Sequence, residues 1–172
     1  MLNIFINTWK NYNVNGADLG EWITLPMNED ELQEKLNEVA ERMHDNDPEW
    51  FVNDYEWTGA YSFRKIEELE NYFELNEWVQ EIDNLDKWDQ KTFAAAYEVF
   101  GETDPGEVDN YRLYEDITTD YDLGYYWIEE SGCYNLDKLG NLQYYFDYEA
   151  FGRDVRFESD GAFSDYGWIE RC

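Results

Sequence analysis

The side chains that could perform chemistry in this chain are carboxylates that lie beside aromatic rings. The sequence has 41 Asp and Glu residues and is 19% Phe, Trp and Tyr. Two carboxylates that flank a glycosidic bond, with rings that hold the sugar, would make a glycoside hydrolase. Among 41 acids, however, a pair at a suitable spacing carries little information. A carbohydrate-active enzyme therefore stays an alternative, which release of reducing sugar from polysaccharides would support.

Carboxylates also bind metal ions, and we considered the metal and phosphate sites that the sequence could form. Residues 45–49 have the alternate acids that open an EF-hand loop, but Trp50 stands where glycine must turn that loop. His44 is the only histidine, too few for a zinc site without cysteines nearby, and we interpret it as a helix-end residue. Residues 16–20 lack the lysine of a phosphate-binding loop. The sequence predicts no catalytic residue, no metal and no cofactor.

The spacing of the acids indicates a surface instead of a catalytic pair. Acids at steps of three and four residues stack on one face of a helix, where like charges destabilise it by roughly 0.2–0.5 kcal/mol per pair. Such a cost is tolerated more readily if the charge is used. We predict that the partner-binding acids are Glu31, Glu34, Glu38, Glu41, Asp45, Glu67, Glu70, Glu74, Glu77, Glu81, Glu129 and Glu130.

The net charge of −29 limits the possible partners. Acidic disordered chains usually lack aromatic residues, so this aromatic-rich chain is predicted to fold. Its own field opposes direct binding to nucleic acid or to an anionic membrane. Cys133 and Cys172 have no CxxC spacing and are expected to be reduced thiols. The N-terminus lacks a basic region and a long apolar run, so we expect a cytoplasmic protein.

The apolar pattern of the first 60 residues predicts a small α+β unit. Strands are expected over residues 2–7, 19–25 and 50–57, the first two as an antiparallel pair. Asn28 is predicted to cap a helix over residues 29–44 that carries four of the acids named above, with Asp45 directly after its end.

The pattern changes to a helical period after residue 61. Three short helices are predicted between residues 62 and 100, the first of them around Ile66 to Phe73. Further on, we expect a strand over 112–117, a helix over 120–130 capped by Asp120, and a hairpin of 155–158 with 162–169. The predicted fold is thus α+β, with an N-terminal α+β domain (1–60), a helical middle domain (61–102) and a C-terminal α+β domain (103–172).

A stretch near the C-terminus combines five aromatic rings with three carboxylates and a guanidinium. Asp147 is predicted to cap a short helix that Gly152 loosens, so that the chain then leads into a strand. The segment Tyr145–Asp154 resembles the Y-x-D-Y-x-A-[FY]-x-R-D signature of the ArdA antirestriction family, whose members mimic DNA and inhibit type I restriction enzymes. Asn7–Asn13 with Gly16, Gly20 and Trp22 resembles the family's opening, with two single-residue insertions. Asp54–Glu56 and Glu129–Gly132 are similar to two further family elements.

The resemblance implies a homodimer that binds the specificity and methyltransferase subunits of type I restriction–modification enzymes. It also implies that the C-terminal domain carries the dimer contact. The residues that we assign to this contact or its support are Tyr144, Tyr145, Phe146, Asp147, Tyr148, Glu149, Phe151, Arg153 and Asp154.

The charge itself sets a length for such a mimic. At one charge per about 1.7 Å of duplex, the net charge corresponds to roughly 50 Å, or about 15 base pairs, which an elongated chain of three domains would fit. Charge spacing alone does not name the target, so a mimic directed at another DNA-binding enzyme stays the second alternative.

Overall fold

The computed structural model describes residues 1–172, apart from the side chains of Asp137 and Leu139. Its fold is α+β, with 49% helix and 19% strand. The chain forms two compact units, which we call the N-terminal unit (Met1–Gln90) and the C-terminal unit (Lys91–Cys172). Each contains one three-stranded sheet. The division into three domains, with boundaries at residues 60 and 102, remains a prediction.

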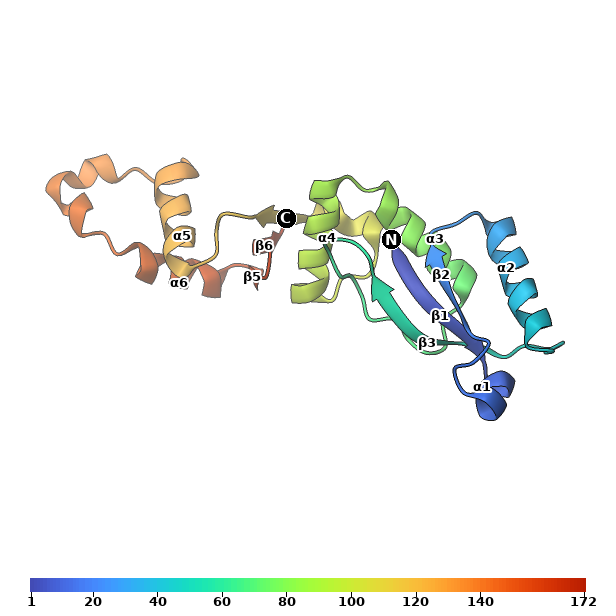
Figure 1. The fold of residues 1–172 in the computed structure, drawn as a ribbon. Helices are drawn as coiled ribbons and strands as arrows, with labels where there is room; N and C mark the ends of the chain where they lie inside the picture. The colour runs from blue at the N-terminus through green and yellow to red at the C-terminus, as the bar shows by residue number, and fades with distance from the viewer. The chain divides into compact units, whose positions relative to one another are not determined.

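The N-terminal unit is a small antiparallel sheet of strand order β2-β1-β3 with helices against it (Figure 1). Its elements are β1 (Leu2–Thr8), α1 (Trp9–Asn15), β2 (Glu21–Leu25), α2 (Glu29–Arg42), β3 (Trp50–Trp57), α3 (Tyr72–Asn84) and the start of α4 (Lys87–Phe100). Leu2 lies opposite both Leu25 of β2 and Trp57 of β3. The predicted strands and the Asn28 cap are confirmed, since the Asn28 side chain accepts a hydrogen bond from the Asp30 amide.

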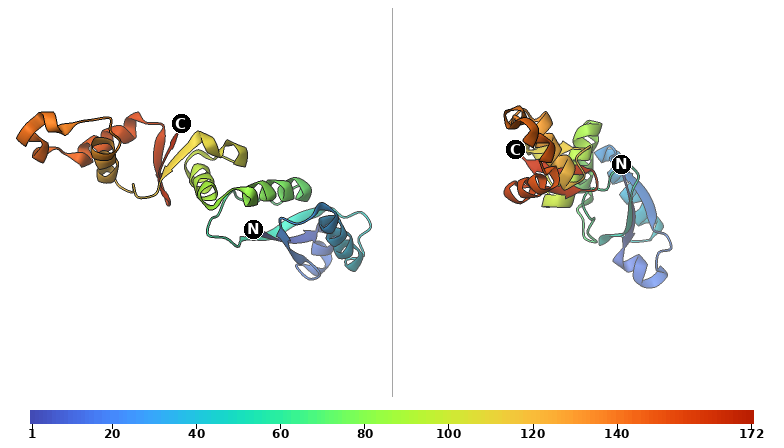
Figure 2. Two further views of the ribbon diagram at one scale, coloured as in Figure 1. Left: turned by 90° about the horizontal axis from the view of Figure 1, so that it is seen from above. Right: turned by 90° about the vertical axis from the view of Figure 1, so that its left-hand side faces the viewer.

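The core of this unit lies between one face of the sheet and the helices α2 and α3, which Figure 2 shows from two further directions. Alternate residues of β1, such as Ile4 and Ile6, are fully buried there. Leu32, Leu36 and Val39 of α2 meet them at helical spacing. Because α2 buries only this stripe, its acidic residues are left on the outer side.

Two local structures in this unit differ from our predictions. Residues 9–15, between the first two predicted strands, form α1, because the Thr8 side chain caps its first turn by accepting from the Asn11 amide. The helix predicted around residues 66–73 is wrong, since α3 begins only at Tyr72. The preceding segment is not helical, because Ile66 is buried in the core and the Glu68 carbonyl accepts a hydrogen bond from the Val52 amide of β3.

The C-terminal unit holds the rest of α4 and a second antiparallel sheet, of order β4-β6-β5. Its further elements are a 3-10 helix (Pro105–Asn110), β4 (Tyr111–Tyr114), α5 (Asp120–Tyr125) continued by a π-helical turn (Tyr126–Glu130), 3-10 turns over Leu136–Tyr145 that are interrupted at Gly140, α6 (Tyr148–Glu158), β5 (Gly161–Ser164) and β6 (Gly167–Arg171). Trp168 and Ile169 of β6 are fully buried and join its hydrophobic clusters.

Three predictions for this unit are wrong. Gly152 does not loosen the helix after Asp147, because it lies inside α6, where it is buried against α5. Residues 155–158 therefore belong to α6, and the hairpin joins β5 to β6 through Asp165 and Tyr166. The cap of α5 is Thr119 and not Asp120, because the Thr119 side chain accepts from the Asp122 amide while Asp122 accepts from the Thr119 amide.

Among the described residues, no helix is both long and apolar enough to span a membrane.

Candidate interaction surfaces

The acidic residues are shared almost evenly between the two units. Of the 41 acids, 22 lie in the N-terminal unit and 19 in the C-terminal unit, and each unit has six Lys and Arg residues. The net charges are therefore −16 and −13. Each unit on its own carries a strong negative field.

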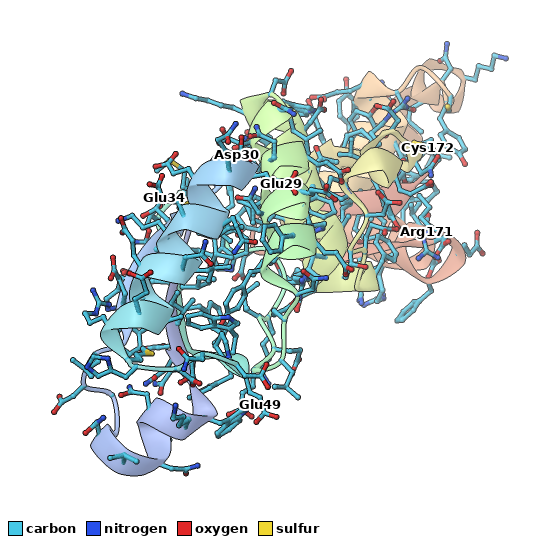
Figure 3. The ribbon with its side chains drawn as sticks, turned by 90° about the vertical axis from the view of Figure 1, so that its right-hand side faces the viewer. Glu29, Asp30, Glu34, Glu49, Arg171 and Cys172 are labelled. Atoms are coloured by element: carbon cyan, nitrogen blue, oxygen red, sulfur yellow. The ribbon has the colours of Figure 1, made fainter. Side chains whose placement is uncertain are left out.

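The largest group of predicted partner-binding acids on one element lies on α2. Glu31, Glu34, Glu38 and Glu41 are all exposed on this helix. Glu29 and Asp30 extend the acidic surface into the first turn, where the positive end of the helix dipole favours carboxylates (Figure 3). Only Glu38 has a described ion-pair partner among these six, Lys35 at 3.3 Å, and this hydrogen bond is the main reason that the pKa of Lys35 is raised.

Asp45 does not belong to this surface, which corrects our prediction. It follows the end of α2, and its side chain is 4% exposed. Lys10 of α1 approaches the carboxylate at 3.4 Å and donates to the His44 carbonyl at 2.9 Å, which ties α1 to the end of α2. Burial alone would raise the pKa of Asp45, but hydrogen bonds from Thr8, the Asp47 amide and Lys10, together with the charge of Lys10, outweigh it and lower the pKa. Asp45 is therefore structural.

A second acidic surface runs along α3. Glu74, Glu77 and Glu81 are exposed on this helix at steps of three and four residues. Glu67 is exposed in the segment before the helix.

Glu70 is the second correction, because it too is held inside the fold. Its side chain is 13% exposed and accepts two hydrogen bonds from Arg64, at 2.7 and 3.0 Å. The Glu67 amide donates a third at 2.9 Å. Burial opposes ionisation of Glu70, yet these donors outweigh it and lower its pKa.

Asp45 and Glu70 illustrate how the few bases are used. Of the eight described ion pairs, six engage a carboxylate whose side chain is at most 35% exposed. The acids in these six pairs are Glu21, which binds two bases, Asp45, Glu70, Glu115 and Asp120. The bases thus neutralise mainly the carboxylates that the fold partly buries, which leaves the exposed acids of α2 and α3, apart from Glu38, without a described ion pair.

In the C-terminal unit, the predicted site residues surround an aromatic cluster. Phe146, Tyr148 and Phe151 are half-buried. The ring centroid of Phe146 lies 5.1 Å from that of Tyr148 and 5.7 Å from that of Phe151. Tyr121 and Tyr125 of α5 pack against Tyr148 at 5.6 and 5.5 Å. Neither tyrosine was among the predicted site residues, although their spacing of four residues on a predicted helix places them on one face.

The remaining predicted residues of this stretch are mostly exposed. Tyr144 and Tyr145 are 79% and 84% exposed. Glu149, Arg153 and Asp154 are exposed on α6, and Asp147 caps this helix as predicted by accepting from the Ala150 amide at 2.9 Å. Large aromatic rings that are exposed to water form a surface that another protein molecule can cover.

Glu129 and Glu130 lie at the end of the π-helical turn and are exposed. Glu129 accepts a hydrogen bond from the Tyr148 hydroxyl, which raises the pKa of Tyr148 to about 12. The acidic helix end is thereby attached to the aromatic cluster.

No three His, Cys, Asp or Glu side chains converge to hold a metal ion within the part of the chain whose side chains are described. Cys133 and Cys172 are free, exposed thiols.

The family model described as "Antirestriction protein (ArdA)" matches residues 4–170 of the 172. No curated protein matches the chain.

Proposed function

This chain belongs to the ArdA family of antirestriction proteins, and on that premise we propose that it inhibits type I restriction–modification enzymes by occupying their DNA-binding groove. The enzyme subunits that form this groove are the specificity and methyltransferase subunits. Inhibition is stoichiometric and competitive with DNA, and the protein performs no chemistry on either molecule.

The observation that carries this proposal is that the described ion pairs engage mainly partly buried acids and few of the exposed ones. Among the exposed acids of α2 and α3, only Glu38 has a described ion-pair partner, whereas most described ion pairs engage acids that the fold partly buries. Solubility alone would not require the Lys and Arg residues to pair mainly with partly buried acids and to leave most exposed acids unpaired. Fixed negative charges are what a groove that binds phosphates can recognise.

The strength of such binding follows from the behaviour of the groove. DNA-binding enzymes gain much of their affinity for DNA from the release of counterions. A protein that holds its carboxylates in place beforehand can occupy the groove without ordering them on binding. Acids of both units contribute, because both carry a large negative charge.

We also propose that two copies associate through the C-terminal unit. The exposed rings of Tyr144 and Tyr145 adjoin the half-buried cluster around Phe146, and together they offer apolar surface that a second copy can cover. A two-fold dimer would double the length of DNA that is imitated.

A competition experiment tests the choice of target. Labelled DNA is bound to a type I methyltransferase and, separately, to an unrelated nuclease, and the protein is titrated into each complex. Displacement from the methyltransferase at near-equimolar protein, with no displacement from the nuclease, is the expected result. Equal displacement from both would support a general mimic of DNA and contradict the type I assignment.

A further inference from the structure

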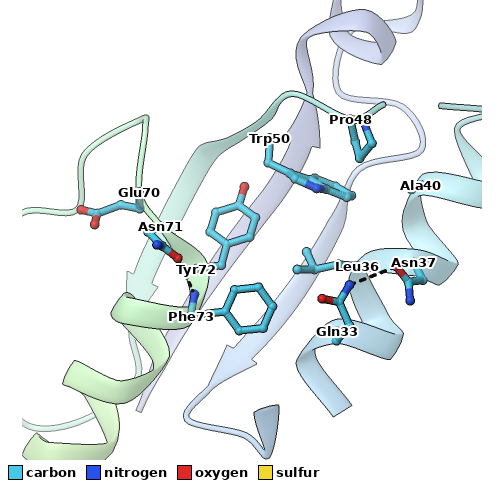
Figure 4. A pocket seen from close by; sticks show the side chains of 10 residues that line it. All are labelled: Gln33, Leu36, Asn37, Ala40, Pro48, Trp50, Glu70, Asn71, Tyr72 and Phe73. Atoms are coloured by element: carbon cyan, nitrogen blue, oxygen red, sulfur yellow. Dashed lines mark hydrogen bonds between the residues drawn. The ribbon is translucent and has the colours of Figure 1, made fainter. Parts of the chain in front are cut away.

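A pocket opens in the N-terminal unit between α2 and the start of α3. Its volume is about 330 Å³, at the low end of the range for ligand sites, which suits one long side chain better than a cofactor. Figure 4 shows the aromatic side chains of Trp50, Tyr72 and Phe73 on one side and α2 on the other. The lining residues are Gln33, Leu36, Asn37, Ala40, Pro48, Trp50, Glu70, Asn71, Tyr72 and Phe73.

The wall of this pocket contains a buried polar atom without a partner. Tyr72 is 4% exposed, and its hydroxyl has no hydrogen-bond partner among the described side chains and backbone. In Figure 4 the hydroxyl points to the side of the pocket where Trp50 lies, and the two ring centroids are 6.2 Å apart. Burial raises the pKa of Tyr72, so the group stays a neutral phenol whose oxygen can accept a hydrogen bond. A buried oxygen of this kind lacks a donor that a ligand could supply.

The surroundings of the pocket select for a cation. The acidic surfaces of α2 and α3 lie on the two helices that border it, and Glu70 forms part of its lining. Arg64, which pairs with the lining residue Glu70, is not part of the lining itself and stacks over Trp78 at 4.7 Å. An anion would be repelled, and an uncharged apolar group would leave the Tyr72 oxygen unsatisfied.

The nature of the wall distinguishes between the possible cations. Trp50 and Phe73 present half-buried rings, on which a planar guanidinium stacks better than a compact, strongly hydrated ammonium. Leu36 and Ala40 provide an apolar surface for the methylene groups of a long side chain.

We propose that this pocket binds one arginine side chain from the DNA-binding groove of the target enzyme. The inference rests on the proposed function and adds to it a shaped contact point within a surface that otherwise acts through its charge. The guanidinium stacks on Trp50 and donates to the Tyr72 oxygen. Such an anchor fixes the register of the mimic in the groove, which diffuse charge does not do.

The first test uses the full-length protein and the peptide acetyl-Gly-Arg-Gly-amide, followed by NMR. The Trp50 indole and the side-chain amides of Gln33 and Asn37 are expected to shift saturably, also at about 0.3 M salt, where non-specific binding to the acidic surface is screened. The matched peptide with citrulline, which has the same shape without the charge, should give no such shift, and the lysine peptide a weaker one. Shifts spread over all acidic helices, or equal shifts with citrulline, would overturn the proposal.

Two variants connect the pocket to inhibition. Tyr72→Phe removes the unpartnered hydroxyl, so we expect its melting temperature to be unchanged or higher and its affinity for the arginine peptide about tenfold lower. Unchanged affinity in this variant would contradict the role of the hydroxyl.

Ala40→Leu fills the pocket from α2 without changing the net charge, and Gln80→Leu adds the same side chain at an exposed position of α3 outside the pocket. We expect only Ala40→Leu to displace DNA from the type I enzyme at least tenfold less well. If it displaces DNA as well as wild type, the arginine contact is overturned while DNA mimicry stands. A wild-type protein that displaces no DNA would instead overturn the proposed function, and the target arginine with it.

Discussion

Gly124 of α5 and Gly152 of α6 touch through their backbones where the two helices cross. A Cβ atom on Gly152 would lie 2.6 Å from the Gly124 nitrogen and 1.7 Å from the Asp120 carbonyl oxygen. A Cβ atom on Gly124 would lie 1.9 Å from the Tyr148 carbonyl oxygen. The crossing therefore requires glycine on both helices, and it holds Tyr148 against Tyr121 and Tyr125.

We expect Gly152→Ala to destabilise the C-terminal unit by about 3 kcal/mol or more, because backbone atoms cannot move aside as a side chain does. Thermal or urea unfolding measures the effect. Gly59→Ala is the matched control, since the nearest atom to its added Cβ is 3.9 Å away, and it should change stability by less than about 0.5 kcal/mol. Equal stability of the two variants would contradict the close crossing.

The ion pair of Arg64 with Glu70 predicts a specific dependence of stability on pH. The folded-state pKa of Glu70 is lowered from 4.5, so its contribution is complete above that pH and is lost as the pH falls through the folded-state value. Glu70→Gln should therefore cost roughly 1–2 kcal/mol at pH 7, the value of a solvent-screened charged hydrogen bond, and little once Glu70 is protonated. Urea unfolding of wild type and variant, at pH 7 and at a pH low enough to protonate Glu70, measures the difference. A cost that is the same at low pH would show that the charge of Glu70 is not what matters.

Several parts of the fold could be predicted from the sequence because they depend on local patterns. The alternation in β1, the Asn28 cap of α2 and the Asp147 cap of α6 are each set by neighbouring residues.

Other parts depend on contacts between distant residues and could not be predicted. Glycine usually weakens a helix, but Gly152 is needed inside α6 because its backbone packs against Asp120 and Gly124, which are far away in the sequence. Glu70 and Asp45 have the spacing of surface acids, and only the positions of Arg64 and Lys10 show that they are structural. Spacing thus identified the acidic helix faces but not which acids the fold uses.

The exposed tyrosines predict the behaviour of the proposed dimer. Changing Tyr144 and Tyr145 together to Ala should shift the protein from dimer to monomer without lowering the stability of the unit, because both rings are largely in solvent. Phe151→Ala should destabilise the unit, since this ring packs against Phe146 and Tyr134. Analytical ultracentrifugation with thermal unfolding separates the two effects. A double variant that stays dimeric would rule out these residues as the contact.

Charge on α2 predicts how inhibition responds to substitution. Single changes such as Glu34→Gln should each weaken binding of the target by less than about 1 kcal/mol, because the energy is spread over many exposed carboxylates. Changing Glu34, Glu38 and Glu41 together to Gln should reduce the affinity for the target by at least tenfold. The triple variant Asp104→Asn, Glu107→Gln and Asp109→Asn removes three charges elsewhere and serves as the comparison. An equal loss in both would show that only total charge matters.

Affinity for the target should also fall steeply with salt, since screening weakens attraction between the acidic surfaces and a basic groove. The slope of affinity against salt is measured from binding of the protein to the type I methyltransferase over an about sixfold range of salt, from roughly 50 to 300 mM. A flat dependence would count against electrostatic mimicry.

The most direct measurement adds purified protein stepwise to a type I restriction enzyme on unmodified DNA and follows cleavage and DNA release in the same samples. We predict that the loss of cleavage and the release of DNA occur together and reach completion near a fixed protein-to-enzyme ratio. Loss of cleavage while the enzyme stays bound to its DNA would contradict the claim that the acidic surface occupies the DNA-binding groove.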